Sequence, residues 1–524
     1  MKTLKLTLRA VFAAALVAML GACGTLPPPR ERPAVQAMAA DPSTKLAKIA
    51  QASTPPGEHS GFRLMPLGVY SLDARIQLAQ RAERSLVVQY YQLENDAVGR
   101  LLLRSLREAA QRGVKVRVLV DDLYTAKSQQ LLLALSETPN VDVRLYNPFC
   151  CARNGLLSRF LASPSEIGRL NHRMHNKLFI ADGKMAVVGG RNIADEYFVL
   201  SEAQNFIDMD ALAVGKVIPQ LETIFDAYWN SEQVRPIDEV VRSDDGRQLT
   251  GVDFDNWVGM AAPPPKIELP PSDILGYGPI GEELDGGRLG LLWGEALAIA
   301  DPPSKPAYMT EDEAIATSVT MKVWGLLLEA QSEVELTSPY LVPGEKGMAA
   351  FDDLRKRQVK LTLLTNSLAA NDEPLVHTGY VRYRKRLLLS GADVYELSPE
   401  RTTAGKRFGM FGKSLGRLHS KTAAIDQRKI FVGSMNLDPR SASQNTEMGV
   451  VIDSPQLARE MLRIINISKL QNSYRLRLAQ PAGTLEWLTT DGEQEMVLTT
   501  EPESSFFKRF YNSLIAPIVP ETLL

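Results

Sequence analysis

The sequence is poor in cysteine and has no excess of charge of either sign. Only 3 of its 524 residues are cysteine, which excludes a disulfide-rich scaffold. Its 59 Lys and Arg residues are balanced by 61 Asp and Glu residues, and no basic stripe is evident. Nucleic-acid-binding proteins usually have such an excess or stripe, so the composition argues against nucleic acid as a partner. Apolar residues make up 45% of the chain, enough for a large buried core.

The apolar run near the N-terminus is too short to span a bilayer. It covers residues 10–20, follows three basic residues, and has the length expected of the apolar region of a signal peptide. The run ends in Leu20-Gly21-Ala22-Cys23, which resembles a bacterial lipobox, where the Cys is lipidated and becomes the new N-terminus. We therefore predict a lipoprotein signal peptide over residues 1–23. An ordinary signal peptide followed by a chance Cys is the alternative.

Lipidation of Cys23 would anchor the protein to a membrane of the cell envelope, facing the periplasm. Gly24 rather than Asp follows, which in bacteria with two membranes indicates the outer membrane, although lipid synthesis at the inner membrane leaves this choice open. Residues 24–57 are rich in Pro, Ala and Ser, a composition that favours a stalk over a packed core.

The rest of the chain divides into two similar halves, residues 58–233 and 311–524. In the first half the apolar spacing predicts a helix over 71–82, a strand over 86–91, a helix over 97–112 and a strand over 114–120. The second half repeats this order over 312–330, 334–337, 347–357 and 359–365. Alternating helices and strands predict an α/β fold, and the repeated order indicates an internal duplication.

The segment between the halves, residues 234–310, is irregular and rich in Pro and Gly. It is either a long linker or, as we prefer, a lid or binding element, because long loops in compact proteins often have such roles.

Each half contains one copy of the same motif. The two copies read His175-Asn176-Lys177, Asp182 and Gly189-Gly190-Arg191-Asn192 in the first half, and His419-Ser420-Lys421, Asp426 and Gly433-Ser434-Met435-Asn436 in the second. The spacings within the two copies are identical. The chain has only 5 His residues, so two at matched positions are poorly explained as ordinary core residues.

The motif suits chemistry on a phosphodiester. On a strand, residues two apart point to one face, so each His lies beside its Lys. If the halves pair about a pseudo-twofold axis, His175, Lys177, His419 and Lys421 converge at their interface. One His then attacks phosphorus and the other protonates the leaving oxygen. The lysines neutralise the phosphate, so we predict neither a metal nor another cofactor.

Further motif residues are expected to assist. Asn192, Ser434 and Asn436 are candidate substrate-binding residues, and the glycines of both copies are expected to let the backbone approach the phosphate. Asp182-Gly183 separates two apolar runs and predicts a hairpin turn. Asp182 and Asp426 complete the catalytic motif, and we interpret their role as mainly structural, orienting the strands.

Two acidic residues downstream of the motifs are candidates to orient the histidines. Glu447 follows the second copy and Asp208 follows the first. A carboxylate bonded to the far nitrogen of a motif His would fix its tautomer. We expect Glu447 to contact His419 and Asp208 to contact His175. The alternative is that both are surface carboxylates.

These motifs resemble the phospholipase D superfamily, and more narrowly the bacterial cardiolipin synthases of the C type. The narrower resemblance covers roughly residue 64 to the end and is carried by the segments 89–91, 173–177, 189–198, 365–372, 376–380 and 433–441. It implies two duplicated α/β/α sandwich lobes related by a pseudo-twofold axis, with the active site at their interface. The lipobox and stalk are features that family members need not have.

The resemblance also implies an activity. Family members transfer a phosphatidyl group from one phospholipid to the glycerol hydroxyl of phosphatidylglycerol through a phosphohistidine, with phosphatidylethanolamine or phosphatidylglycerol as the donor. Family habit makes His175 the nucleophile and His419 the acid. The alternatives are a phospholipase D that transfers the group to water and a non-catalytic envelope lipoprotein that binds lipid headgroups. Phospholipids and a membrane are the expected partners, and protein partners are unknown.

The C-terminus predicts an amphipathic helix. Apolar residues at 506, 507, 510, 511, 514 and 515 fall on one helical face, with Lys508 and Arg509 beside it. We expect this face to pack on the second half as ordinary core. The alternative is that it lies in a lipid interface.

Overall fold

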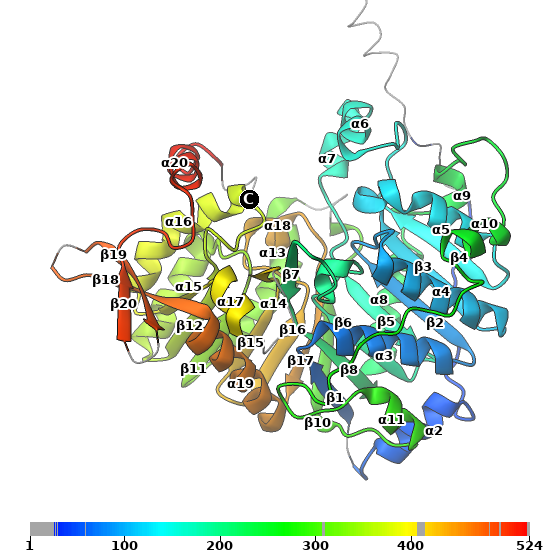
Figure 1. Ribbon diagram of the computed structural model, residues 1–524, viewed down its shortest axis with the longest axis horizontal. Helices are drawn as coiled ribbons and strands as arrows, with labels where there is room; N and C mark the ends of the chain where they lie inside the picture. The colour runs from blue at the N-terminus through cyan, green and yellow to red at the C-terminus, as the bar shows by residue number, and fades with distance from the viewer. Residues whose placement is uncertain are drawn as a thin grey trace, which may run out of the picture.

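The computed structural model describes residues 26, 28, 30–57, 59–305, 310–405, 414–481, 483–491 and 494–520 (Figure 1). The predicted signal peptide and the lipidation site Cys23 lie outside these residues. Within the described part, no helix has both the length and the apolar character needed to cross a membrane.

The chain forms two lobes joined by a linker. The N-terminal lobe contains α2 (Lys45–Ser53), β1 (Ser60–Met65), α3 (Gly68–Arg81), β2 (Ser85–Tyr90), α4 (Ala97–Gln111), β3 (Lys115–Asp121), η1 (Asp122–Lys127), α5 (Gln129–Ser136), β4 (Val141–Tyr146), α6 (Leu156–Leu161), η2 (Pro164–Glu166), α7 (Ile167–Leu170), β5 (Lys177–Ala181), β6 (Met185–Gly189), η3 (Asp195–Tyr197), β7 (Gln204–Ile207), β8 (Asp210–Gly215), α8 (Val217–Trp229) and β9 (Val234–Pro236). The linker contains α9 (Ile237–Val240), α10 (Gly251–Trp257), α11 (Ile280–Asp285) and β10 (Leu292–Ala300).

The C-terminal lobe repeats the pattern. It contains α13 (Glu311–Thr317), α14 (Val319–Leu328), β11 (Glu333–Thr337), α15 (Gly344–Lys356), β12 (Lys360–Asn366), α16 (Pro374–Leu389), β13 (Asp393–Leu397), α17 (Pro399–Gly405), β14 (Leu415–Leu418), β15 (Thr422–Ile425), β16 (Lys429–Gly433), α18 (Pro439–Ser443), β17 (Met448–Asp453), α19 (Pro455–Asn472), β18 (Ser473–Leu478), β19 (Leu485–Asp491), β20 (Gln494–Leu498) and α20 (Phe506–Ile515). The predicted helix over 312–330 is two helices, because Ser318 ends α13 and caps α14.

Within the described residues, one sheet of 18 strands runs through both lobes. In the first lobe its order is β4-β3-β2-β5-β6-β8-β1, and in the second the matching order is β13-β12-β11-β15-β16-β17-β10. In both lobes the first three strands are parallel and the remaining pairs antiparallel. The matched order confirms the predicted duplicated α/β fold, and β1 pairs with β10 at the seam between the lobes.

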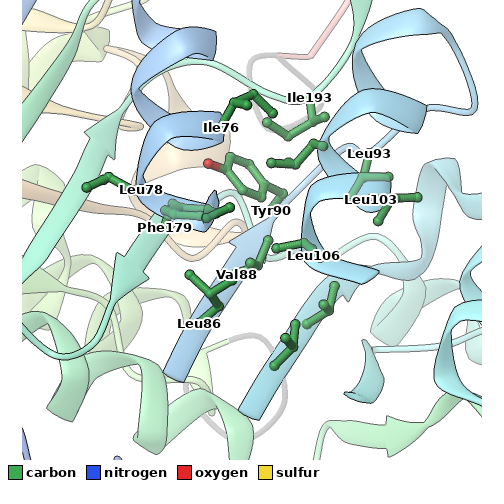
Figure 2. Packing of buried hydrophobic residues seen from close by; sticks show 14 of the residues in the cluster. Ile76, Leu78, Leu86, Val88, Tyr90, Leu93, Leu103, Leu106, Phe179 and Ile193 are labelled. Carbon is green, nitrogen blue, oxygen red and sulfur yellow. The ribbon is translucent and has the colours of Figure 1, made fainter. Parts of the chain in front are cut away.

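Three buried cores support this sheet. One fills the N-terminal lobe, where β2 packs between α3 and α4 around Tyr90, whose hydroxyl accepts a hydrogen bond from Arg75 (Figure 2). A second fills the C-terminal lobe. The third is shared, because α8 and α19 bury side chains such as Phe225 and Ile464 in one cluster with strands of both lobes. This shared core holds the two lobes in a fixed relation.

Part of the range predicted as a stalk packs on the body. Helix α2 buries Leu46 and Ile49 in the core of the N-terminal lobe. Upstream of it, the backbone N–H of Val35 donates to Asn230 and that of Ala37 donates to Asp226. The Pro- and Ala-rich composition obscured a short amphipathic helix at residues 45–53.

The linker differs from the expected lid. Its helix α10 packs against α5, and α11 packs against α3, both on the N-terminal lobe. Strand β10 lies within the range predicted as an insertion but occupies the place in the second repeat that β1 occupies in the first. The linker therefore completes the sheet.

Candidate active site

The two motif hairpins have the turns that their sequences indicate. Asp182 and Gly183 have φ values of 52° and 60°, as in the two-residue turn that suits the twist of a hairpin. Asp426 and Gln427 repeat this with 51° and 54°. The strand that leads into each turn, β5 in the first lobe and β15 in the second, begins at or directly after the motif Lys.

Asp182 and Asp426 make the same contacts in the two lobes, and these contacts are structural. The Asp182 carboxylate accepts hydrogen bonds from the backbone N–H groups of residues 83–85, where β2 begins. The Asp426 carboxylate accepts from the N–H groups of residues 331–333, where β11 begins. Each Asp thus fastens its hairpin to the neighbouring strand.

Backbone pairing across the lobe interface positions each motif His. In the first lobe, Met174 bridges Thr446, and the N–H of His175 donates to the Thr446 carbonyl at 2.8 Å. In the second, β14 pairs with β7, and the N–H of His419 donates to the Ile207 carbonyl at 2.8 Å. Each motif is therefore held by a segment of the other lobe.

The acid partners are exchanged between the lobes, which corrects our expectation. Glu447 Oε2 lies 2.9 Å from His175 Nδ1, and Asp208 Oδ2 lies 2.5 Å from His419 Nδ1. The sequence-based prediction pairs each acid with the His of its own half. The bridging residues Thr446 and Ile207 immediately precede the two acids, so the backbone pairing across the interface places each acid on the opposite His.

The contacts at Nδ1 fix the tautomers. The carbonyl oxygen of Ser434 lies 3.0 Å from His175 Nδ1, and since a carbonyl only accepts, this nitrogen carries the hydrogen. Asp208 is an ionised acceptor, so Nδ1 of His419 also donates. The Nε2 atom of each ring therefore remains for chemistry: it has a lone pair in the neutral imidazole and carries a proton in the charged one.

Both lysines lie beside their histidines. Lys177 Nζ donates to the His175 carbonyl at 2.7 Å, and Lys421 Nζ donates to the His419 carbonyl. All four side chains are buried: the relative exposure is 7% for His175, 0% for Lys177, 6% for His419 and 1% for Lys421. The structure thus brings both halves of the motif together in one site.

This arrangement concentrates positive charge and lowers the pKa of every basic group in it. Burial, followed by the charges of the two lysines, lowers the pKa of His175 well below its usual value. Burial and Lys421 lower the pKa of His419 to about 4. Burial also lowers the pKa of Lys177 strongly and that of Lys421 to about 8. A phosphate anion would relieve this repulsion, so the site is electrostatically prepared for a phosphodiester.

The two acids differ in charge. Burial raises the pKa of Asp208, but His419, Lys421 and Arg191 outweigh it and lower that pKa to about 2. Burial raises the pKa of Glu447 to about 7, although Lys177 opposes it. His419 therefore faces a permanent negative charge, whereas the partner of His175 is only partly ionised near neutral pH. The Asp208 charge opposes the effects of burial and Lys421 on His419, and a bound phosphate anion would raise the His419 pKa further, toward the protonated form that a general acid requires.

Glu447 is held by a network that sequence reasoning missed. Its carboxylate accepts hydrogen bonds from the Ser434 and Ser441 hydroxyls. Its backbone N–H donates to Asp301 at 2.8 Å, and Asp301 forms a buried ion pair with Lys305 at 2.8 Å. Ser441 lies in a segment that carried the resemblance, but no sequence pattern marked Asp301 or Lys305, which belong to the Pro-rich linker.

The predicted substrate-binding residues divide into two kinds. Ser434 supports Glu447, so its hydroxyl is committed to the acid. Asn192 donates to the Tyr197 hydroxyl at 2.8 Å. Among the described residues, the side-chain oxygens of Asn192 and Asn436 are buried without a hydrogen-bond partner. Each of these two Asn side chains therefore has an oxygen that can still accept a hydrogen bond.

The motif glycines make room for protein rather than for phosphate, which corrects a second expectation. A Cβ at Gly190 would collide with the Asp208 carboxylate, and one at Gly433 would collide with the Met448 carbonyl. These glycines let the segments that contain Asp208 and Met448 approach the motif closely.

Aromatic rings enclose both histidines. Tyr91 packs edge-on to His175 with ring centres 5.0 Å apart, and Lys177 Nζ lies 5.2 Å from the centre of the same ring. Tyr197 and Phe206 contact His419 at 4.9 and 5.1 Å. With relative exposures of 7% for His175 and 6% for His419, little of either imidazole is open to water.

Comparison with known proteins agrees with this geometry. The family described as cardiolipin synthase, PLD-like domain, matches residues 75–229 and 324–467. Cardiolipin synthase C of Escherichia coli (strain K12) is 35% identical over 489 residues, which cover 92% of this chain and 100% of that protein. A cardiolipin synthase of Staphylococcus aureus (strain Mu50 / ATCC 700699) is 26% identical, covering 80% of this chain and 69% of that protein.

A solved structure shares the fold. Phosphatidylserine synthase of Haemophilus influenzae Rd KW20 aligns with a TM-score of 0.56 and covers 92% of this chain and 100% of that chain. At 14% sequence identity, this likeness shows the common fold alone.

Proposed function

The chain belongs to the cardiolipin synthase family with PLD-like domains, and we propose that it is a phosphatidyltransferase that makes cardiolipin from phosphatidylglycerol and a second phospholipid. The observation that carries this proposal is the single buried site in which His175 and His419, one from each lobe, stand with two lysines and two exchanged acids.

The first half-reaction forms a phosphohistidine. His175 Nε2 attacks phosphorus, the bond from phosphorus to the headgroup oxygen breaks, and His419 donates its Nε2 proton to that oxygen. Lys177 and Lys421 neutralise the non-bridging oxygens. The permanent charge on Asp208 supports the protonated His419, which is the physical reason for assigning the acid to the second motif.

The second half-reaction reverses these roles. The glycerol hydroxyl of phosphatidylglycerol attacks phosphorus, its proton passes to His419 Nε2, and the bond from phosphorus to His175 breaks. Cardiolipin leaves and both histidines return to their starting states. The donor, phosphatidylethanolamine or phosphatidylglycerol, loses ethanolamine or glycerol in the first step.

Hydrolysis is the second candidate function. Water could replace the glycerol hydroxyl as acceptor, which would make the protein a phospholipase D. The aromatic enclosure of both histidines favours transfer, because it limits water at the intermediate. Purified protein in vesicles of phosphatidylglycerol and phosphatidylethanolamine separates the two: cardiolipin with free ethanolamine or glycerol supports transfer, whereas phosphatidic acid as the main product supports hydrolysis.

For the location we propose a lipid anchor. Lipidation at Cys23 would hold the catalytic body at a cell-envelope membrane, facing the periplasm, where its phospholipid substrates lie. Replacing Cys23 with Ala should shift the protein from the membrane fraction toward the soluble fraction, and the same distribution for the variant and the wild type would contradict the anchor.

A further inference from the structure

Helix α20 exposes the apolar face that we expected to be buried. The relative exposures of Phe506, Phe507, Phe510, Tyr511 and Leu514 are 66%, 79%, 56%, 51% and 57%. The opposite face is the packed one, because Asn512 is buried there and α20 contacts α16. The expectation of core packing was therefore wrong, since the helix is docked by its polar side.

A second apolar helix projects from the other lobe. On α6, Leu156, Leu157 and Leu161 are 42%, 73% and 71% exposed. Its Arg159 is fully buried and donates to the Asp122 carbonyl, which anchors the polar side of the helix to η1. Figure 1 shows α6 and α20 standing out along the same edge of the molecule, one from each lobe.

A short chain of contacts connects each helix to the active site. Helix α6 packs on η1, whose Tyr124 contacts Tyr91 at 5.3 Å between ring centres, and Tyr91 contacts His175. Helix α20 packs on α16, whose first turn carries the exposed Leu375 and follows Asp372. The Asp372 carboxylate accepts from Tyr340, and its charge acts on Lys421.

Positive charge accompanies the apolar face. Lys508 and Arg509 lie on α20, and Arg417 of β14 is close enough to Lys508 to act on it electrostatically. The nearby acid Glu501 is paired with Arg384 at 2.6 Å. Aromatic rings with adjacent basic side chains match the acyl and headgroup regions of a bilayer that contains anionic lipid.

We propose that α20 and α6 form a membrane-docking face that sets the entrance of the active site against a bilayer containing anionic lipid. The inference rests on the proposed function, because a phospholipid substrate reaches the site from that bilayer. A tether at the N-terminus leaves the orientation of the body free, and two exposed apolar helices, one on each lobe, fix it.

A local probe tests the docking face in the full chain. Phe507→Trp places an indole on α20, and Leu297→Trp places one on β10, at the opposite edge in Figure 1, where Leu297 is 57% exposed. With vesicles of phosphatidylglycerol and phosphatidylethanolamine that carry brominated acyl chains, the added fluorescence at 507 is quenched and that at 297 is not. Equal quenching at both positions, or quenching at 297 alone, would overturn the proposal.

Turnover of two substrate forms provides the second test. Phe507→Glu with Phe510→Glu, and Leu157→Glu with Leu161→Glu, reduce cardiolipin formation from vesicles by roughly tenfold or more, because buried apolar area is lost from the interface. Leu297→Glu leaves it unchanged. All variants retain wild-type turnover of short-chain phosphatidylglycerol dispersed as monomers, which shows that they fold.

The outcomes separate the two proposals. Variants that keep vesicle turnover overturn the docking face. If the wild type also self-associates in sedimentation and the Phe507→Glu, Phe510→Glu variant does not, the apolar face is an interface between copies of this chain instead. A wild-type protein that makes no cardiolipin from either substrate form overturns the proposed function, while the quenching experiment still decides the docking face.

Discussion

Replacing Asp208 with Asn is expected to slow turnover by removing the charge that supports the protonated form of His419. The carboxylate is 1% exposed, lies 2.5 Å from His419 Nδ1, and has a pKa lowered to about 2 against the effect of burial. A hydrogen bond to a charged group contributes about 1.5–3 kcal/mol. If the transition state loses this full contribution to its stability, the rate falls roughly 10- to 150-fold.

The pH profile distinguishes this effect from a general loss of structure. The charged carboxylate raises the pKa of His419, so Asp208→Asn lowers it further. The falling limb of the profile, where the acid loses its proton, then moves to lower pH by about one to two units, since one unit corresponds to about 1.4 kcal/mol. Cardiolipin formation by purified protein, measured over a pH series, gives both the maximum rate and the pH at which the rate falls.

Glu447→Gln is the matched control on the other histidine. Because burial raises the pKa of Glu447 to about 7, the wild-type side chain is mostly protonated below that pH and mostly ionised above it. The variant should match the wild type on the acid side and become slower than it on the alkaline side. An unchanged limb in Asp208→Asn, or the same pH response in both variants, would refute the assignment of His419 as the acid.

Three other changes are expected to have distinct effects. Lys177→Met or Lys421→Met should abolish most turnover. Asp182→Asn should mainly lower the free energy of unfolding, by about 1.5–3 kcal/mol, because its carboxylate accepts hydrogen bonds from three backbone N–H groups. Equal losses of turnover in the Lys and Asp variants at matched stability would place Asp182 in the chemistry. Lys305→Met leaves Asp301 buried and unpaired and should destabilise the fold by about 3–5 kcal/mol in denaturant unfolding; an unchanged midpoint would contradict the network. Activity should persist in strong chelators, since lysines supply the positive charge; a loss restored by zinc or calcium would show the charge assignment to be wrong.

The strands and the duplication could be read from the sequence because local periodicity encodes them. The predicted strand over 86–91 is β2 (Ser85–Tyr90), and the predicted helix over 97–112 is α4 (Ala97–Gln111). The hairpin at Asp182-Gly183 followed from turn chemistry, which is also local. Identical spacing in two copies was enough to predict that their histidines meet.

The features that sequence reasoning missed depend on long-range pairing. Glu447 lies 28 positions after His419 in the chain but bonds to His175, because the pairing of Met174 with Thr446 crosses the lobe interface. Lys305 and Asp301 lie in a Pro-rich segment without periodicity, so only the fold reveals their ion pair behind Glu447. The orientation of α20 was missed because helical spacing defines an apolar face but not the neighbour that covers it.

Trapping the covalent intermediate tests directly whether His175 attacks phosphorus and His419 acts as the acid in a single site. A phosphatidyl donor with an aryl leaving group needs no acid, so His419→Ala should still form the adduct and accumulate it, because the second step lacks its base. Mass spectrometry of the trapped protein should locate the phosphatidyl group on His175 and find none in His175→Ala. An adduct on His419 in His175→Ala, or no adduct in His419→Ala, would contradict the account.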